Sequence, residues 1–330
     1  MTAGPEGLLI VDKEAGLTSA QVVARVRRLS GIRRVGHTGT LDPFATGVLP
    51  VCLGRATAAA TYMLNWDKAY QCQIRLGFAT DTMDSDGQAT DIAPGKESWL
   101  PFLEGDPAAI LTLKETVASL ASITCQQAPL YSAVKIKGKP LYKYAREGKE
   151  VERPVRPVTI YESSYLGLSR DREGYPLVAV RFLVSSGTYI RSLADQLGRQ
   201  LGCFAHAASL RRLSTGHLDL SSAVRLDTLT GKGELERFLQ PVTEAFRGWP
   251  QLPLTEQEGL DMAHGRAIPC PTDRIESADP GLARLAPPPD MDWLTFRYLD
   301  RLVAVGRREE DSCRPRRVFI TPEELRKEKR

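Results

Sequence analysis

The run from Gly36 to Val51, GHTGTLDPFATGVLPV, changes character half-way along. Its first half is rich in glycine and threonine and holds one aspartate, Asp42, directly before Pro43, whereas its second half is apolar. A run of this kind has to form a polar loop that a buried strand ties to the protein core. Pro43 restricts Asp42 to extended backbone, and Pro50 predicts that the following strand is short or lies at a sheet edge.

The residue types along the chain exclude several chemistries for Asp42. There is no G-x-S-x-G motif for a serine nucleophile, and no G-K-[ST] follows the glycines as in a P-loop. His37 and Asp42 alone make a poor metal site, so we expect no metal. Two interpretations remain at this point. Asp42 is either a nucleophile or acid–base group for a phosphate-bearing substrate, or an ordinary aspartate that caps the turn before Pro43.

The neighbouring runs predict regular elements around this loop. Residues 8–11 favour a short buried strand, and Thr18 and Gln21 have the spacing of a capping box for a helix that ends at Gly31. Residues 70–76 alternate between apolar and polar, so Tyr70 starts the inward face of a strand, where a side chain can reach a cleft. The acidic run 80–88 lacks the spacing of a calcium loop and is expected to be a solvated turn.

The run SSGTYIRSLADQLG, which starts at Ser185, predicts a turn and then a helix after the apolar strand 176–184. Tyr189 and Arg191 fall in the first turn of this helix. A cation at a helix start opposes the helix dipole. We therefore expect Arg191 to have an anionic partner, either a carboxylate or a phosphate.

The net charge is only +4, from 44 lysines and arginines against 40 aspartates and glutamates, but the basic residues are clustered. The segment 126–157 holds eight of them together with three tyrosines. It is either an ordinary basic hairpin or a segment that closes on a nucleic acid. Further clusters lie at residues 25–34 and at the C-terminus, and together the three clusters favour a nucleic-acid partner.

The remaining composition is typical of a soluble protein. The six cysteines stand singly, as reduced thiols do, and no apolar run has the length of a membrane span. No secretory signal is visible, so we expect a cytoplasmic protein that does not contact a membrane. The pattern changes near Pro241, which predicts a main domain over residues 1–240 and a small β-rich domain over residues 241–330.

GHTGTLDPFATGVLPV resembles the catalytic motif of the TruB family of tRNA pseudouridine synthases. Five further runs resemble family motifs in the family's order: DKEAGLTS, KAYQCQIRLG, QQAPLYSAVKIKGKPLYKYAREGKEVERPVR, SSGTYIRSLADQLG and AASLRRLSTG. The resemblance implies an α+β class, with the pseudouridine synthase fold: a central mixed, largely antiparallel sheet flanked by helices and loops, followed by a small β-rich PUA-like domain. Glu14 and Ala128 depart from the pattern, since the family usually has proline at both positions.

For the site, the resemblance implies that Asp42 is the nucleophile, that Tyr70 packs on the target base as a candidate general base, and that Arg191 pairs with Asp42. It also implies substrate-binding roles for five residues: His37 near the extruded nucleotide, Tyr189 and Leu210 in the nucleotide pocket, and Lys13 and Lys68 as phosphate contacts. The residues alone explain Leu210 nearly as well as a core residue, and the two lysines equally well as surface residues.

The implied activity is conversion of the T-loop uridine of tRNA, position 55 by tRNA convention, to pseudouridine after the base has flipped out. No cofactor is expected, because the isomerisation needs no redox step and no external group. Residues 126–157 would be a thumb that closes over the T-arm of tRNA, and we expect a monomer without an obligate protein partner. Two alternatives stay open: a non-catalytic RNA-binding or RNA-folding protein, and a synthase of the RNA-guided branch, which the long thumb disfavours.

Overall fold

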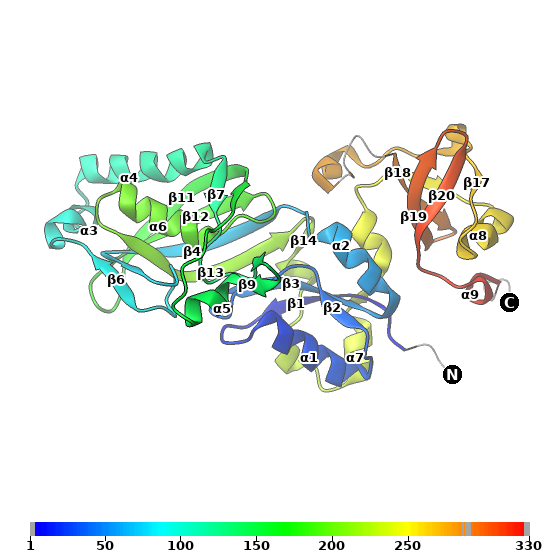
Figure 1. Ribbon diagram of the computed structural model, residues 1–330, viewed down its shortest axis with the longest axis horizontal. Helices are drawn as coiled ribbons and strands as arrows, with labels where there is room; N and C mark the ends of the chain where they lie inside the picture. The colour runs from blue at the N-terminus through cyan, green and yellow to red at the C-terminus, as the bar shows by residue number, and fades with distance from the viewer. Residues whose placement is uncertain (1–3, 286, 288–291, 327–330) are drawn as a thin grey trace.

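The computed structural model describes residues 4–285, 287 and 292–326 (Figure 1). Its larger part is built on a nine-stranded sheet. In chain order the strands are β1 (Gly7–Lys13), β2 (Val35–His37), β3 (Thr46–Leu53), β4 (Lys68–Leu76), β11 (Ile160–Arg170), β12 (Pro176–Val184), β13 (Ala205–Thr215), β14 (Leu218–Asp219) and β15 (Leu239–Gln240). Seven of them follow the spatial order β11–β12–β4–β13–β3–β1–β15, while β2 pairs with β3 and β14 with β13. Only β3 and β13 run parallel, so the expected mixed, largely antiparallel sheet is confirmed.

The strand that follows the Asp42 loop, β3, is longer and more central than Pro50 predicted. It has eight residues and lies between β1 and β13. Pro50 stands opposite Ile10 of β1, and its carbonyl accepts a hydrogen bond from the Thr38 N–H (3.1 Å) beyond the end of β2. The amide and carbonyl of one strand residue point to the same side, so the missing N–H of Pro50 faces the end of β2 and costs no bond to β1. The prediction of a short or edge strand was wrong for this reason.

Two buried apolar clusters hold helices on this sheet. The helix α1 (Ser19–Ser30) has the predicted capping box and ends at Gly31, which is left-handed, and its apolar face packs with β1 and β3. The helices α6 (Ile190–Gln200) and α4 (Pro107–Ser119) pack with β4, β12 and β13 in the second cluster. Three short helices complete this part: α2 (Ala60–Met63), α3 (Leu100–Glu104) and α7 (Lys232–Arg237).

Residues 126–157, which we call the thumb segment, form an excursion between α4 and β11. Its ends pair as β7 (Cys125–Gln127) and β10 (Val155–Pro157), which closes the excursion at its base. Between them lie the hairpin β8–β9 (Lys135–Ile136 and Lys139–Pro140) and the helix α5 (Leu141–Arg146). A second small ladder, β5 (Phe78–Thr80) with β6 (Ala89–Ile92), encloses the acidic run.

The C-terminal part has a sheet of its own, which confirms the predicted β-rich character. Its strand order is β16 (Gln251–Pro253), β18 (Trp293–Tyr298), β19 (Arg301–Glu309), β20 (Ser312–Val318) and β17 (Ile268–Pro269), accompanied by α8 (Glu256–Ala263) and α9 (Pro322–Arg326). Figure 1 shows this part at one end of the long sheet. The first sheet ends with β15 and the second begins with β16, so the expected boundary at Pro241 falls between them.

The two parts are packed together rather than tethered. Met63 and Trp66 of the first part share one buried cluster with Leu302 and Phe319 of the second. Beside this cluster, the Arg55 guanidinium contacts both Glu6, at 2.9 Å, and Glu324 of α9. Apolar burial of this kind supplies most of the stability of such a contact.

Among the described residues there is neither a membrane-spanning helix nor a cluster of metal ligands. No helix there is both long and apolar enough to cross a bilayer. The same residues contain no group of three histidine, cysteine, aspartate or glutamate side chains that could hold a metal ion. The six cysteines are free thiols.

The contact between Arg55 and Glu324 predicts a pH dependence of stability. The Arg55 guanidinium lowers the pKa of Glu324 from 4.5 to about 2. A carboxyl group with a lower pKa in the folded state stabilises the fold above its unfolded pKa, and this is lost as the pH falls through the folded value. The free energy of unfolding should therefore fall between about pH 5 and pH 2, and less steeply in Glu324→Gln.

Urea unfolding of the whole chain at several pH values measures this difference. Glu115→Gln is the matched control, because Glu115 is exposed on α4. Its pH curve should follow that of the unmodified chain. Parallel curves for Glu324→Gln and the unmodified chain would contradict the prediction.

Candidate active site

The loop that carries Asp42 is held by its main chain. The Ser19 hydroxyl accepts a hydrogen bond from the Leu41 N–H (2.9 Å) and donates one to the Leu41 carbonyl (3.1 Å). On the other side, the Gly16 N–H donates to the Pro43 carbonyl (2.9 Å). The backbone before and after Asp42 is therefore fixed, and this fixes the direction of its carboxylate.

Two buried cations hold the same loop. Lys13 Nζ donates to the carbonyls of Pro43 (3.1 Å) and Leu17 (2.7 Å). Arg212 of β13 donates to the Thr40 carbonyl (3.3 Å). Both side chains are buried. A buried cation is tolerated only when its donors are satisfied, and here the acceptors are the carbonyls of the loop and its surroundings.

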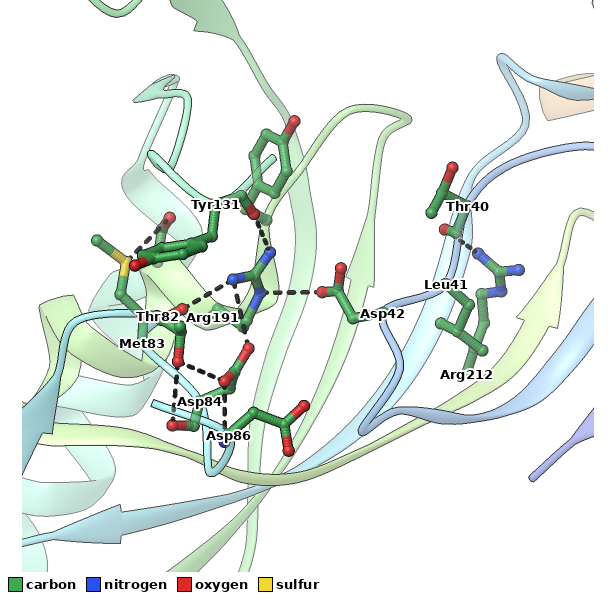
Figure 2. A network of polar contacts seen from close by, with 12 residues as sticks. Thr40, Leu41, Asp42, Thr82, Met83, Asp84, Asp86, Tyr131, Arg191 and Arg212 are labelled. Atoms are coloured by element: carbon green, nitrogen blue, oxygen red, sulfur yellow. Dashed lines mark hydrogen bonds and ion pairs between the residues drawn. The ribbon is translucent and has the colours of Figure 1, made fainter. Parts of the chain in front are cut away.

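Arg191 is the centre of a network of polar contacts (Figure 2). Its side chain is 4% exposed, and its Nε lies 2.9 Å from Oδ2 of Asp42. Its Nη1 lies 3.3 Å from Oδ2 of Asp84 and donates to the Thr82 carbonyl (2.7 Å), while Nη2 donates to the Tyr131 carbonyl (2.9 Å). The anionic partner expected for Arg191 is thus a pair of carboxylates.

Asp84 corrects the prediction that residues 80–88 are a solvated turn. Its side chain is 7% exposed, and its Oδ1 accepts hydrogen bonds from the Thr82 hydroxyl (2.5 Å) and the Asp86 N–H (3.1 Å). Burial raises the pKa of Asp84, while the Thr82 hydroxyl and the Arg191 charge act in the opposite direction. Asp84 is buried in a turn that is otherwise mostly exposed or half-buried, because Arg191, from a distant part of the sequence, provides the counter-charge.

A cavity of about 490 Å³ opens in front of the Asp42–Arg191 pair. The residues that line it include Asp42, Lys68, Tyr70, Ser132, Lys135, Arg156, Tyr189, Arg191 and Leu210. Tyr70 comes from β4, Leu210 from β13 and Tyr189 from the start of α6. The volume is within the range of small-molecule sites. Most of the residues predicted for the site are therefore brought to one cavity.

Lys13 and Lys68 are not the surface lysines that the sequence allowed. Both are buried, and Lys68 Nζ donates to the carbonyls of Leu64 (2.8 Å) and Trp66. Burial lowers the pKa of Lys13 to about 8 and that of Lys68 to about 7, and the charge of Arg212 acts in the same direction. Their ammonium groups bind the protein's own main chain, so these contacts give no support to a role in binding phosphate.

His37 lies half-buried at the end of β2, outside the set of residues that line the cavity. Its Nδ1 accepts a hydrogen bond from the Gly39 N–H (3.3 Å), which assigns the ring proton to Nε2. Burial and the Arg212 charge lower the pKa of His37, which favours the neutral ring. Its contact with an extruded nucleotide stays a prediction.

The two positions that depart from the expected prolines both make polar contacts. Glu14 pairs with Arg225 at 2.7 Å. The Ala128 N–H donates to the Pro154 carbonyl (3.0 Å), a hydrogen bond that a proline in place of Ala128 could not make. Ala128 therefore adds a bond to the base of the thumb segment.

Comparisons with known proteins agree with this geometry. The model described as "TruB family pseudouridylate synthase (N terminal domain)" matches residues 27–190, and that described as "tRNA pseudouridylate synthase B C-terminal domain" matches residues 191–247. A protein of Stutzerimonas stutzeri named tRNA pseudouridine synthase B is 39% identical, over 80% of this chain and 84% of its own length. One of the same name from Pseudomonas aeruginosa is 35% identical over 95% of both chains. The chain belongs to the TruB family of pseudouridylate synthases.

Solved structures share the fold of this TruB-family chain. A chain of a Cbf5–Nop10–Gar1 complex matches with a TM-score of 0.66 and 24% identity, over 97% of this chain and 86% of its own. A chain of an archaeal box H/ACA Nop10–Cbf5 complex matches with a TM-score of 0.64 and 23% identity, over 97% and 88%. At this identity the likeness concerns the fold alone, and it confirms the predicted fold.

Three residues that shape this TruB-family site were not singled out in the sequence. They are Ser19, Asp84 and Arg212. Ser19 directly follows the predicted cap, Arg212 lies in the run AASLRRLSTG, and Asp84 lies in the acidic run. Each of these residues lies in or beside a run with a recognisable pattern. No local pattern, however, predicts which distant segment the side chain of the residue contacts.

Because the three guanidinium nitrogens of Arg191 contact different partners, Arg191→Lys should disturb the site. A lysine keeps the charge but has one nitrogen, so it cannot hold Asp42, Asp84 and two carbonyls together. We expect kcat for pseudouridine formation to fall roughly 100-fold, as for a small misplacement of a reacting group. Steady-state kinetics and tRNA binding on the same preparation measure this, and the affinity should change little.

Arg199→Lys is the matched control, because Arg199 lies on the exposed side of the same helix and pairs there with Asp195. It should keep the kcat of the unmodified chain. An Arg191→Lys variant with unchanged kcat would show that catalysis does not require the several contacts of the guanidinium group.

Proposed function

We propose that this chain converts the uridine at position 55 of the tRNA T-loop to pseudouridine, with Asp42 as the nucleophile. The relatives that match over most of the chain are named tRNA pseudouridine synthase B. The observation that carries the proposal is the contrast within one ion pair. The Asp42 side chain is 34% exposed and lines the cavity, whereas its partner Arg191 is buried. Arg191 contacts Oδ2 of Asp42, so Oδ1 can face a substrate.

The reaction is an isomerisation, and this fits a site with one reactive carboxylate. The bond between uracil N1 and ribose C1′ breaks, the same uracil turns, and a bond forms between C5 and C1′. The hydrogen on C5 leaves as a proton, and N1 gains a proton. Asp42 starts the sequence by attacking the sugar or the base, or by enabling elimination. No oxidant, reductant or group donor enters this balance, so the proposal includes no cofactor.

The other cavity residues have separate tasks in this proposal. Tyr70 packs on the uracil ring and is the candidate base for the C5 proton. Tyr189 and Leu210 line the space beside the flipped nucleotide. Taking a base out of its stack costs a few kcal/mol, and an aromatic and apolar wall offsets part of that cost.

The thumb segment is proposed to bind the T-arm. Lys135 and Lys137 are exposed on its hairpin, and Lys135 also lines the cavity. Lys139 is different, because Glu147 pairs with it at 2.5 Å and compensates its charge. Phosphate binding by this hairpin is therefore assigned to Lys135 and Lys137.

We also propose separate roles for the two parts of the chain. Residues 1–240 would carry the chemistry, since the cavity residues end at Arg212, and residues 241–330 would be a PUA-like RNA-binding accessory. Because Phe319 shares a buried cluster with Met63 and Trp66, the accessory also stabilises the catalytic part. The proposal includes a monomer without an obligate protein partner.

The competing function is a tRNA-binding or tRNA-folding protein without catalysis. Release of tritium from uridine labelled at C5 separates the two, since only the isomerisation replaces the C5–H bond. A transcript with cytidine at position 55 should release none. Tight tRNA binding by the unmodified chain without any tritium release would refute the proposed activity.

Asp42→Asn gives the sharpest test of the nucleophile. The amide keeps the shape of the side chain but not its charge, so pseudouridine formation should vanish while tRNA affinity stays near that of the unmodified chain. Single-turnover assays and binding on one preparation measure both. Asp91→Asn, on the exposed strand β6, is the control and should remain active. Substantial single-turnover activity in Asp42→Asn would exclude Asp42 as the nucleophile.

Neutralising the hairpin lysines should weaken binding without changing the chemical step. In Lys135→Gln with Lys137→Gln, two phosphate contacts are lost, so the slope of log affinity against log salt should become shallower by about 1 per lysine. Titration of tRNA at several salt concentrations measures the slope. Lys232→Gln with Lys114→Gln, two lysines away from the cavity, controls for total charge. A slope equal to that of the unmodified chain would rule out these phosphate contacts.

A further inference from the structure

We propose that Gln126 is a positioning residue that couples the thumb segment to the Asp42–Arg191 pair; this rests on the function proposed for that site. Gln126 lies in β7, at the base of the thumb segment. It is 7% exposed, whereas its neighbours Cys125 and Gln127 are exposed. Its side chain therefore points into the protein from a strand whose other residues face solvent.

The Gln126 side chain binds both main-chain groups of Tyr189. Its Oε1 accepts a hydrogen bond from the Tyr189 N–H (2.9 Å), and its Nε2 donates to the Tyr189 carbonyl (3.3 Å). Tyr189 is the residue from which α6 starts, and its own side chain makes no capping bond there. The amide of Gln126 thus fixes the beginning of α6.

At neutral pH, an amide side chain of this length can make both bonds. A carboxylate accepts but does not donate, and a thioether or aliphatic side chain does neither with comparable strength. The two bonds also fix the orientation of the amide, because exchanging Oε1 and Nε2 would set donor against donor. A glutamine at position 126 therefore supplies both the acceptor and the donor that the main chain of Tyr189 requires.

The site lies directly downstream of this contact. Tyr189 lines the cavity, and Arg191, two residues further along, binds Asp42. The thumb segment contacts the same place a second time, because the Tyr131 carbonyl accepts a hydrogen bond from Arg191 Nη2 (2.9 Å). A change in the position of the thumb is thereby transmitted to the tyrosine of the cavity and to the partner of the nucleophile.

The base of the thumb segment does not depend on the Gln126 side chain for its closure. The ladder between β7 and β10 and the bond from Ala128 to Pro154 involve only main-chain groups. Removing the amide should leave this ladder in place and release the start of α6. The expected effect is on the chemical step, and a loss of thumb structure is not expected.

The first experiment replaces the amide with a side chain of similar length. In Gln126→Met the single-turnover rate of pseudouridine formation should fall about 10- to 100-fold, as for a small misplacement of reacting groups. The dissociation constant for tRNA should change by less than about 3-fold, since the phosphate-binding lysines are untouched. Gln200→Met, at the exposed far end of α6, is the matched control and should keep the normal rate.

The second experiment uses a side chain that can be switched. In Gln126→Glu the introduced carboxyl group can donate to the Tyr189 carbonyl only when it is protonated. The single-turnover rate of this variant, divided by that of the unmodified chain, should therefore rise as the pH is lowered from about 8 to 5. A general loss of packing gives no such rescue, so this measurement decides the matter even if Gln126→Met does not fold.

Three outcomes would overturn the proposal: an unchanged single-turnover rate in folded Gln126→Met, a loss confined to tRNA affinity, or a rate ratio of Gln126→Glu that does not vary with pH. Failure of the proposed function has a different signature. In that case the unmodified chain itself releases no tritium from tRNA labelled at uridine C5, and the Gln126 variants have no rate to compare.

Discussion

The site depends on a buried guanidinium whose charge has to be compensated inside the protein. Arg191 takes its partners from three segments: the loop of Asp42, the turn that holds Asp84, and the thumb segment through the Tyr131 carbonyl. Removing one partner of a buried charge costs about 3–5 kcal/mol, far more than an exposed ion pair contributes. The three segments therefore have to be in place together for Arg191 to be buried at all. One cation thus joins Asp42, the proposed nucleophile, and the thumb segment, the proposed RNA-binding part, in a single arrangement.

The loop of Asp42 is organised by the same requirement. Lys13 and Arg212 are buried because loop carbonyls accept their hydrogen bonds, and the loop is ordered because these cations bind it. The strands β3 and β13 also approach each other closely beside this loop. Gly47 of β3 has a φ of +102°, and a Cβ there would lie 2.1 Å from the carbonyl oxygen of Arg212 in β13. Only glycine permits that approach. The cations use main-chain acceptors, and so the Asp42 carboxylate is left for Arg191 and for a substrate.

The sequence predicted those features that local patterns determine. The capping box at Thr18, the inward face that starts at Tyr70 and the need of Arg191 for an anion follow from spacing and from the helix dipole, and the structure has all three. The roles at the site came from the family resemblance. The failures concern burial that distant segments create. Pro50 is central because β2 ends beside it, and Asp84 is buried because α6 brings Arg191 to it. Lys13 and Lys68 are buried because carbonyls surround them. Arg191 is far from Asp84 in the sequence, and so is Pro43 from Lys13. The Leu64 and Trp66 carbonyls are near Lys68, but no local pattern predicts that its side chain folds back onto them.

The two RNA-binding parts proposed here are joined to the catalytic sheet by different forces, and this gives them different mobility. The C-terminal part shares an apolar cluster with the sheet, and each large side chain buried there contributes about 1.5–3 kcal/mol. The thumb segment reaches α6 through two hydrogen bonds of the Gln126 side chain, each with a net contribution of about 0.5–1.5 kcal/mol. It reaches Arg191 through the Tyr131 carbonyl, which accepts a charged hydrogen bond of about 1.5–3 kcal/mol. Binding of a phosphate backbone can change these few contacts more readily than a cluster of many buried apolar side chains. The thumb segment is therefore the part through which RNA binding can adjust the Asp42–Arg191 pair, while the C-terminal part acts as a fixed surface.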